Sequence, residues 1–153
     1  GFVIDTNFDI KNGNAITYSL AGVLKSLSAN TSFDTGTTAV IAADKWGIAI
    51  LTEDGTTAAV TWAAASIGYA TEALAIAALG RISTLIPTSA QAALGYVTVQ
   101  TASGQTWTAG TDALEGGTGG NPSADTNYYN DPTLNGTFGG FQIGNLSGTV
   151  IVQ

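Results

Sequence analysis

The stretch LGYVTVQTASGQTWTAGTDAL, residues 94–114, decides how this chain is expected to fold. Residues 94–101 alternate in the manner of a β-strand. The alternation predicts one face with Leu94, Tyr96, Thr98 and Gln100 and an opposite face with Gly95, Val97, Val99 and Thr101. The remainder is rich in small hydroxyl-bearing residues and glycine, and few of its groups could carry out chemistry. The stretch therefore predicts a strand followed by turns, in a protein that builds a surface.

The composition fits one globular domain with an uncharged polar surface. A chain of 153 residues can bury a core, and 44% hydrophobic residues argue against wholesale disorder. Charged residues make up only 10% of the chain, against a usual share of about 25%. Such a surface suits a protein packed into an assembly, because each charge that meets a neighbouring subunit must be desolvated.

Charge and missing residue types exclude several classes of function. The net charge is −7, and the four basic residues are scattered, so neither nucleic acid nor an anionic membrane surface is an expected partner. The chain has no Cys and no His, which removes the thiolate nucleophile, the commonest general base and the commonest transition-metal ligands. We therefore expect no enzyme activity, no cofactor and no metal.

Three features bear on processing and membranes. The chain lacks Met, so we expect that Gly1 is not the translation start and that an initiator Met or a longer leader has been removed. No signal peptide is recognisable. The longest apolar run, around residues 73–79, is far shorter than the roughly 20 residues that span a bilayer.

A hairpin and a helix are the clearest elements in the middle of the chain. WGIAILTEDGTTAAVTW, residues 46–62, predicts a central strand that is apolar on both faces, a turn at Glu53-Asp54-Gly55 and a returning strand. Residues 71–83 predict the single helix, capped by Thr71. Its expected apolar stripe consists of Leu74, Ala78, Leu79 and Ile82.

Both ends of the chain are predicted to be extended. Residues 1–10 alternate like a strand, KNGN at 11–14 predicts a tight hairpin turn, and residues 15–27 predict one or two strands with Ile16, Tyr18 and Leu20 on one side. Residues 115–132 form a Gly- and Asn-rich loop, and 133–153 a glycine-interrupted arm that ends in the strand-forming TVIVQ. The predicted fold is therefore mainly β, an antiparallel sandwich or barrel-like domain over residues 1–132, with one short covering helix and an extended C-terminal arm.

Acidic residues give weak candidates for chemistry. The nearest pairs that could act as acid and base are Glu53 with Asp54, Asp112 with Glu115, and Asp125 with Asp131. Residues 125–131 also offer oxygen ligands for calcium, but the spacing of a known calcium loop is missing and Asx turns explain the same residues. We expect neither a catalytic pair nor a metal site.

Exposed aromatic rings point instead to contacts with a partner. Trp107 lies among Thr and Gly, and Tyr128 and Tyr129 lie in a polar segment, where rings stack on sugars or bury in subunit interfaces. The apolar terminal segments could add to the sheet edge of a neighbour. The predicted contact residues are Phe2, Ile4, Trp107, Tyr128, Tyr129, Phe138, Phe141, Val150 and Val152.

The order of these motifs resembles a segment of tailed-bacteriophage virion proteins of the head-fibre, capsid-decoration and tail-fibre-like kind. The residues that carry the resemblance are WGIAILTEDG, TEALAIAAL, LGYVTVQT, TWTAGTDAL and TNYY, within residues 15–130. The GGTGGNPS insertion and the tail after Pro132 depart from that pattern. The resemblance implies a protein of the virion surface, often trimeric, with the major capsid protein as partner.

Three functions follow as hypotheses. The first is capsid decoration, in which symmetric copies bury apolar area across capsid subunit junctions and oppose rupture of the shell. The second is a fibre module that displays Trp107 and the 115–132 loop to a host glycan. The third is an extracellular filament subunit that joins copies through its terminal strands.

Overall fold

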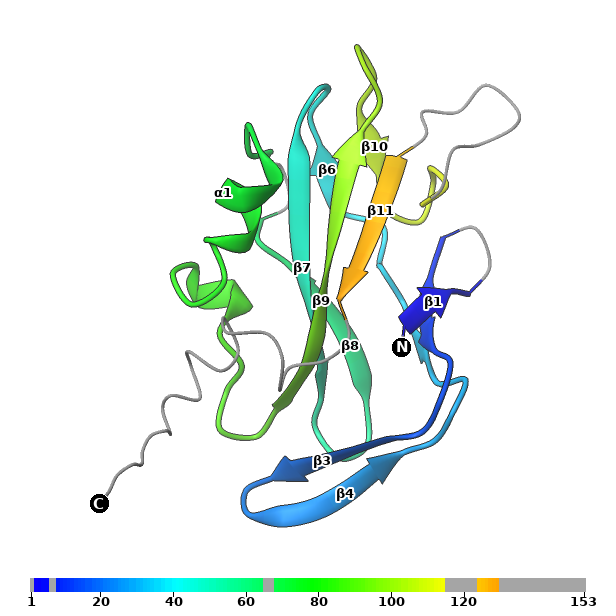
Figure 1. The fold of residues 1–153 in the computed structure, drawn as a ribbon, viewed down its shortest axis with the longest axis vertical. Coiled ribbons are helices and arrows are strands. Elements are labelled where there is room, and N and C mark those ends of the chain that lie inside the picture. Colours follow the sequence, from blue (N-terminus) through cyan, green and yellow to red (C-terminus); the bar gives the residue numbers. More distant parts are fainter. Residues whose placement is uncertain (1, 6–7, 65–67, 115–123, 130–153) are drawn as a thin grey trace.

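The structure is a computed structural model that describes residues 2–5, 8–64 and 68–114, and the backbone of residues 124–129. The chain is mainly β, with several antiparallel sheets and, within the described residues, one α-helix (Figure 1). The predicted fold class is confirmed over this part of the chain. The predicted arm at 133–153 lies outside the described residues.

The largest sheet has four antiparallel strands in the order β11-β9-β7-β8. The strands are β7 Trp46–Glu53, β8 Ala58–Trp62, β9 Ala92–Thr101 and β11 Ala124–Tyr129. β7 and β8 form the predicted hairpin, in which Gly55 adopts the positive φ of 98° that glycine tolerates best. The hairpin at 46–62 and the strand at 94–101 are thus confirmed. The prediction that residues 115–132 form a loop is wrong at 124–129, because these residues pair with β9 as the strand β11.

Smaller elements cover the two faces of this sheet. β1 Phe2–Ile4, β2 Ile10–Asn12 and β5 Ser32–Phe33 form one small sheet, β3 Ile16–Leu20 and β4 Val23–Leu27 form a hairpin, and β6 Val40–Ile41 pairs with β10 Trp107–Thr108. The helical elements are α1 Glu72–Ile76 and the 3₁₀ turn η1 Ser83–Leu85.

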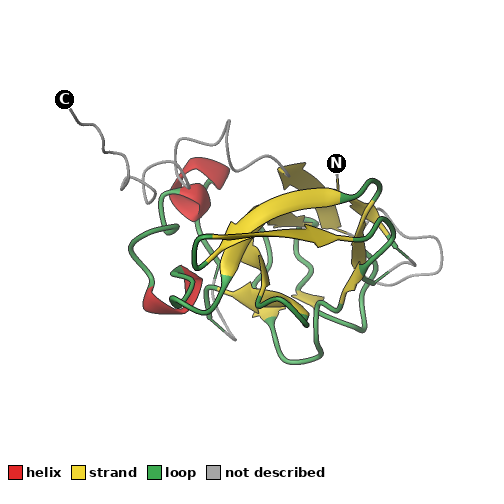
Figure 2. Ribbon diagram, turned by 90° about the horizontal axis from the view of Figure 1, so that it is seen from below, coloured by secondary structure: helices red, strands yellow, loops and turns green. Residues whose placement is uncertain are grey.

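The central sheet separates two hydrophobic cores. The helical elements lie together on one side of the molecule, away from the small sheets (Figure 2). In β7, Ala49 and Leu51 face the core shared with the small sheets, whereas Ile48 and Ile50 face the core shared with α1 and η1. Because a strand points successive side chains to opposite faces, burial on both sides requires the continuous apolar run that β7 has. The middle of this sheet is therefore the centre of the fold, and the other elements pack against its two faces.

A β-bulge changes the predicted faces of β9. Leu51 pairs with Gly95 while Thr52 pairs with Ala93, so Leu94 is an extra residue in β9. Leu94 consequently lies in the same core as Val97 and not with Tyr96, which faces the helix side. The prediction that Leu94 shares a face with Tyr96 is wrong, because one inserted residue reverses the alternation on one side of it.

Gly47 allows the β6–β10 pair to lie directly on β7. A Cβ atom at residue 47 would overlap the side chain of Ile41, which belongs to β6. Ile41 in turn pairs with Trp107 of β10. The absence of a side chain at one position of the central strand thus brings a second layer into contact with it.

The helix is shorter than the sequence predicts. Thr71 caps it as expected, since its hydroxyl accepts the N–H of Leu74 at 3.2 Å, but α1 ends at Ile76 instead of continuing to residue 83. Gly80 has a positive φ of 78° and so ends the helical turns that follow. Leu74 is 54% exposed, and the buried side of α1 centres on Ala75, about 100° further round the helix. The prediction is therefore wrong for Leu74, whereas Ala78 and Leu79 are buried and Ile82 packs against the same core, as predicted.

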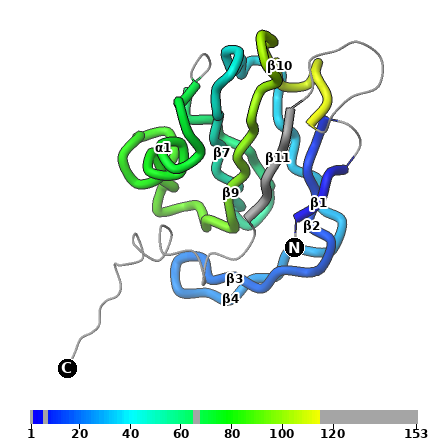
Figure 3. The backbone as a smooth tube through the Cα atoms, turned by 45° about the horizontal axis from the view of Figure 1, so that its top comes forward, coloured from blue at the N-terminus to red at the C-terminus, as the bar shows by residue number. Residues whose placement is uncertain are grey.

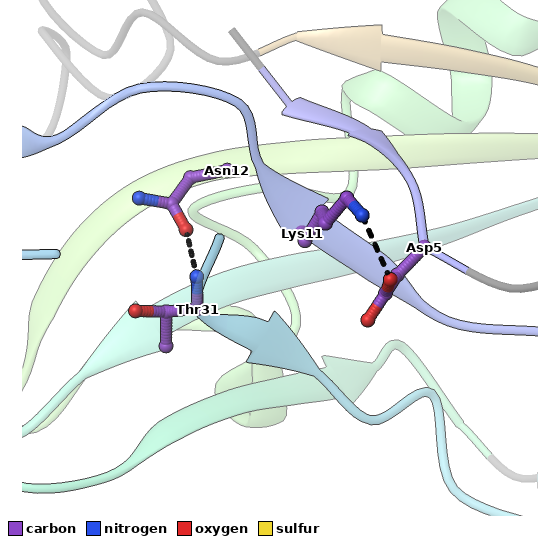
Figure 4. Close-up of polar contacts among 4 residues, drawn as sticks. All are labelled: Asp5, Lys11, Asn12 and Thr31. Carbon is purple, nitrogen blue, oxygen red and sulfur yellow. Dashed lines mark hydrogen bonds and ion pairs between the residues drawn. The ribbon is translucent and has the colours of Figure 1, made fainter. Parts of the chain in front are cut away.

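The KNGN segment is not the predicted hairpin turn. β2 extends to Asn12 and pairs with β1 and β5, whereas β3 pairs with β4. The buried side chain of Asn12 donates from Nδ2 to the carbonyls of Asn14 at 2.8 Å and Ser28 at 2.7 Å. Its Oδ1 accepts the N–H of Thr31 at 2.7 Å (Figure 4). An Asn that was expected to favour a turn instead ties the adjacent β2–β3 connection and the distant β4–β5 loop to a strand.

We expect Asn12→Ala to lower the free energy of unfolding by about 3 kcal/mol, because it removes a buried side chain that makes three hydrogen bonds to backbone groups. Urea denaturation monitored by tryptophan fluorescence measures the change. Asn12→Asp should cost at least as much at neutral pH, since it sets an oxygen against the two carbonyls that Nδ2 now contacts. The control is Asn14→Ala, at an exposed side chain. A loss below about 0.5 kcal/mol for Asn12→Ala would contradict the role of Asn12.

Candidate functional site

The first candidate pair of acids holds a turn in place. Asp54 Oδ1 accepts the N–H groups of Thr56 and Thr57 at 2.9 and 2.8 Å and the Thr56 hydroxyl at 2.8 Å. These hydrogen bonds hold the pKa of Asp54 below its usual value. Glu53 Oε1 accepts the N–H of Gly55 at 2.8 Å. Both carboxylates are therefore engaged by the β7–β8 turn.

The other candidate acids lie only partly within the described residues. Asp112 is buried, and its Oδ2 accepts the N–H of Thr108 at 2.7 Å. Asp125 belongs to β11, where only the backbone is described, and Glu115 and Asp131 lie outside the described residues. Across the part of the chain that the structure describes, no group of three or more carboxylates could hold a metal ion.

The predicted N-terminal contact residues lie in β1. Phe2 is buried and packs edge-on against Phe33, with ring centroids 5.3 Å apart. Ile4 is partly buried against the same core. β1 lies beside β11, the strand that contains Tyr128 and Tyr129, so the structure brings these two predicted segments together. The last four predicted residues, Phe138, Phe141, Val150 and Val152, lie outside the described residues.

Trp107 is in the core and not on the surface. Its exposed fraction is 0%, its ring contacts Trp62 with centroids 5.2 Å apart, and its Nε1 donates to the carbonyl of Ala113 at 3.1 Å. The expectation that this ring is exposed is wrong, because the β6–β10 pair folds it inward against the central sheet. A sugar cannot stack on it while this packing persists.

The β3–β4 hairpin presents the most prominent exposed apolar residues of the described chain. Val23 is 57% and Leu24 75% exposed. The turn residues Ala21 and Gly22 have positive φ angles of 51° and 81°, as a two-residue hairpin turn requires. The hairpin lies across one end of the central sheet (Figures 1 and 3). It is the candidate functional site of the described residues.

The pairing of the hairpin determines which backbone groups face outward. In a two-residue hairpin the residues next to the turn exchange hydrogen bonds, and the pattern then alternates along the ladder. Leu20 pairs with Val23 and Tyr18 with Lys25, so the N–H and C=O groups of Leu24 and Ser26 point away from β3. Among the described residues, β4 has no second strand partner. One edge of the hairpin is therefore available for pairing.

Contacts on the inner side fix the hairpin to the body. Ile16, Tyr18 and Leu20 lie on one side of β3, as the sequence predicts, and that side packs against the core. A Cβ on Gly55 would come within 3.3 Å of Leu20 and 3.5 Å of the Lys25 Nζ, so the β7–β8 turn lies close under the hairpin. Burial raises the pKa of Tyr18, and the charge and hydrogen bond of Glu53 raise it further, with a smaller contribution from the Asp54 charge.

The sequence prediction of contact residues missed this site. Val23 and Leu24 were placed in a strand, but nothing in their alternation indicated that they would be exposed. The Ala21-Gly22 pair between two alternating runs was the usable signal, because it predicts a two-stranded hairpin. Which edge of that hairpin stays open is decided by the packing of β3 against the body.

Comparison of the chain with protein-family models, with curated proteins and with solved structures finds no match in any of the three. Within the described residues, no helix is long and apolar enough to cross a membrane.

Raising the pH above 10 should destabilise the chain through Tyr18. Because the folded-state pKa of Tyr18 is raised, the unfolded tyrosine loses its proton first, and stability falls as the pH rises through the folded pKa. Tyr18→Phe should remove this part of the alkaline loss. Denaturant titrations at pH 8 and pH 11 on both chains measure it, and an equal alkaline loss in both would contradict the assignment.

Trp107→Ala should lower the free energy of unfolding by about 4 kcal/mol, since it empties a buried site and removes the contact with Trp62. Trp107→Phe, which keeps an aromatic ring but loses the bond to Ala113, should cost less. Chemical denaturation compares the two variants. A nearly unchanged stability of Trp107→Ala would mean that the ring is not part of the core.

Proposed function

We propose that this chain is a structural protein of a tailed-bacteriophage particle that decorates the outside of the capsid. The observation that carries the proposal is the β3–β4 hairpin, a firmly anchored element with an open strand edge and exposed apolar side chains. An element of this kind suits contact with another protein chain, through main-chain hydrogen bonds and apolar burial.

The surface chemistry supports the same proposal. Few charged residues need to be desolvated when copies pack together, since they make up only 10% of the chain. The motif order WGIAILTEDG, LGYVTVQT and TWTAGTDAL, which resembles virion surface proteins, points to the particle as the place of assembly. The partners would be further copies, with a trimer favoured, and the major capsid protein.

The mechanism would be mechanical. A decoration protein that binds the assembled shell more tightly than free capsid protein stabilises the shell by mass action. Copies placed across subunit junctions add buried area that must be exposed again before the shell can open. No reaction or cofactor is needed for this role.

The rival hypotheses are less well supported by the described residues. A glycan platform built on Trp107 conflicts with the complete burial of that ring. A filament subunit would use an open strand edge as readily as a decoration protein does, but it would form open-ended polymers and not a closed oligomer.

Light scattering on the purified full-length chain separates a closed oligomer from a filament. We expect a discrete trimer that persists when the chain is cut after residue 132. Long polymers that collapse to monomer on this truncation would overturn the decoration hypothesis in favour of the filament.

Co-sedimentation tests the capsid partner directly. The chain should sediment with shells assembled from the major capsid protein of the same phage, and it should not associate with that protein before assembly. Shells that carry bound protein should withstand a higher temperature than bare shells. Failure to bind assembled shells would contradict capsid decoration even if a trimer forms.

A further inference from the structure

The outer edge of β4 is a surface that other chain segments can extend. The N–H and C=O groups of Leu24 and Ser26 point away from β3, and Leu24 is 75% exposed. An open edge with exposed apolar residues is a template for strand addition. The question is which strand it takes.

A second copy of β4 fits this edge poorly. The antiparallel register that pairs all five residues of two β4 strands is centred on the middle residue, Lys25. It would place Lys25 opposite Lys25 of the partner subunit. Like charges directly opposite each other destabilise a strand pair. A strand without a positive charge is the better occupant.

The C-terminal segment of the chain has the required composition. Residues 133–153 contain no charged side chain, and Thr149, Val150, Ile151 and Val152 are consecutive β-branched residues. The segment 149–153 matches the length of β4, Val23–Leu27. It can therefore pair along the whole edge without setting a charge against Lys25.

The chain leaves the described body in the right direction. β11 runs antiparallel to β9 and ends at Tyr129, opposite Tyr96, and β9 begins at Ala92. The beginning of β9 and the β7–β8 turn mark the end of the sheet where the hairpin lies, so β11 points toward the hairpin (Figure 1). Residues 130–153 can span up to about 80 Å when extended, which is ample to reach β4 of the same or an adjacent copy.

We infer that the open edge of β4 is the docking site of residues 149–153, which add to the β3–β4 hairpin as a third strand. Main-chain hydrogen bonds would form with Leu24 and Ser26, and β-branched side chains would cover Val23 and Leu24. The inference goes beyond the proposed function, because it assigns the acceptor of the C-terminal segment whether or not the particle is a capsid.

Cysteine cross-linking in the full-length chain tests this docking. The natural chain has no Cys, so Ser26→Cys can be combined with a single Cys at position 149, 150, 151 or 152 without competing thiols. The matched control is Thr17→Cys, because Thr17 is the direct cross-strand partner of Ser26, is also exposed, and lies on the opposite edge. Disulfide formation under mild oxidation should be at least tenfold faster with Ser26→Cys than with Thr17→Cys. Equal rates from the two edges would overturn the inference.

Amide hydrogen exchange gives a second measurement that needs no cysteine. The outward N–H groups of Leu24 and Ser26 should be protected in the full-length chain. Val150→Lys combined with Val152→Lys should speed their exchange at least tenfold, because it brings positive charge to Lys25, and should leave the inward N–H of Lys25 unchanged. Rapid exchange of Leu24 and Ser26 in the natural chain would mean that the edge is unpaired and that Lys25 only guards it against aggregation.

The mass of the cross-linked species separates this inference from the proposed function. A link within one chain supports docking in the same copy, and a link between chains supports strand exchange between copies. A stable trimer without any cross-link would overturn the docking site and leave the decoration proposal standing. A cross-linked monomer that does not bind shells would support the docking site and contradict the decoration proposal.

Discussion

The antiparallel pairing of β7 with β9 is the contact on which the rest of the molecule depends. Both strands are buried on both faces, so neither can be stable until two separate layers cover them. α1 and η1 provide one layer, and the short strands of the N-terminal half, with β10, provide the other. The short strands form few backbone hydrogen bonds with one another. They are therefore held in place mainly by the side chains that they bury against β7 and β9.

Polar groups inside this scaffold act mainly as connectors. Asn12 ties β2 to two loops, Thr98 donates to Glu72 at 2.8 Å and so joins β9 to α1, and Thr101 accepts the N–H of Lys45 at 2.9 Å. A buried polar group is stable only when it is hydrogen-bonded, and each of these bonds therefore selects one arrangement of the layers. Among the described residues, the most exposed large apolar side chains are Val23 and Leu24, on the hairpin that lies across the end of the sheet.

Docking of a strand on β4 would connect the fold to assembly in a simple way. The hairpin is held by its inner face, through Ile16, Tyr18 and Leu20, so a strand added to its outer edge requires no rearrangement of the core. The same edge would be a hazard if it stayed open, and Lys25 at its centre disfavours pairing between identical edges. A second β4 strand and residues 149–153 could both form main-chain hydrogen bonds with this edge, and the charge of Lys25 favours the uncharged segment.

The sequence by itself determined the mainly β class, the 46–62 hairpin, the strand at 94–101 and the Thr71 cap, because these follow from local alternation, turn residues and capping chemistry. Tertiary structure alone decided that Leu94 forms a bulge, that Asn12 is a buried connector and not a turn residue, and that Trp107 lies in the core. It also decided that Val23 and Leu24 are exposed and that the β4 edge is open. The physical reason is that a local pattern gives the period of an element, whereas burial and pairing depend on residues distant in the sequence that pack against it.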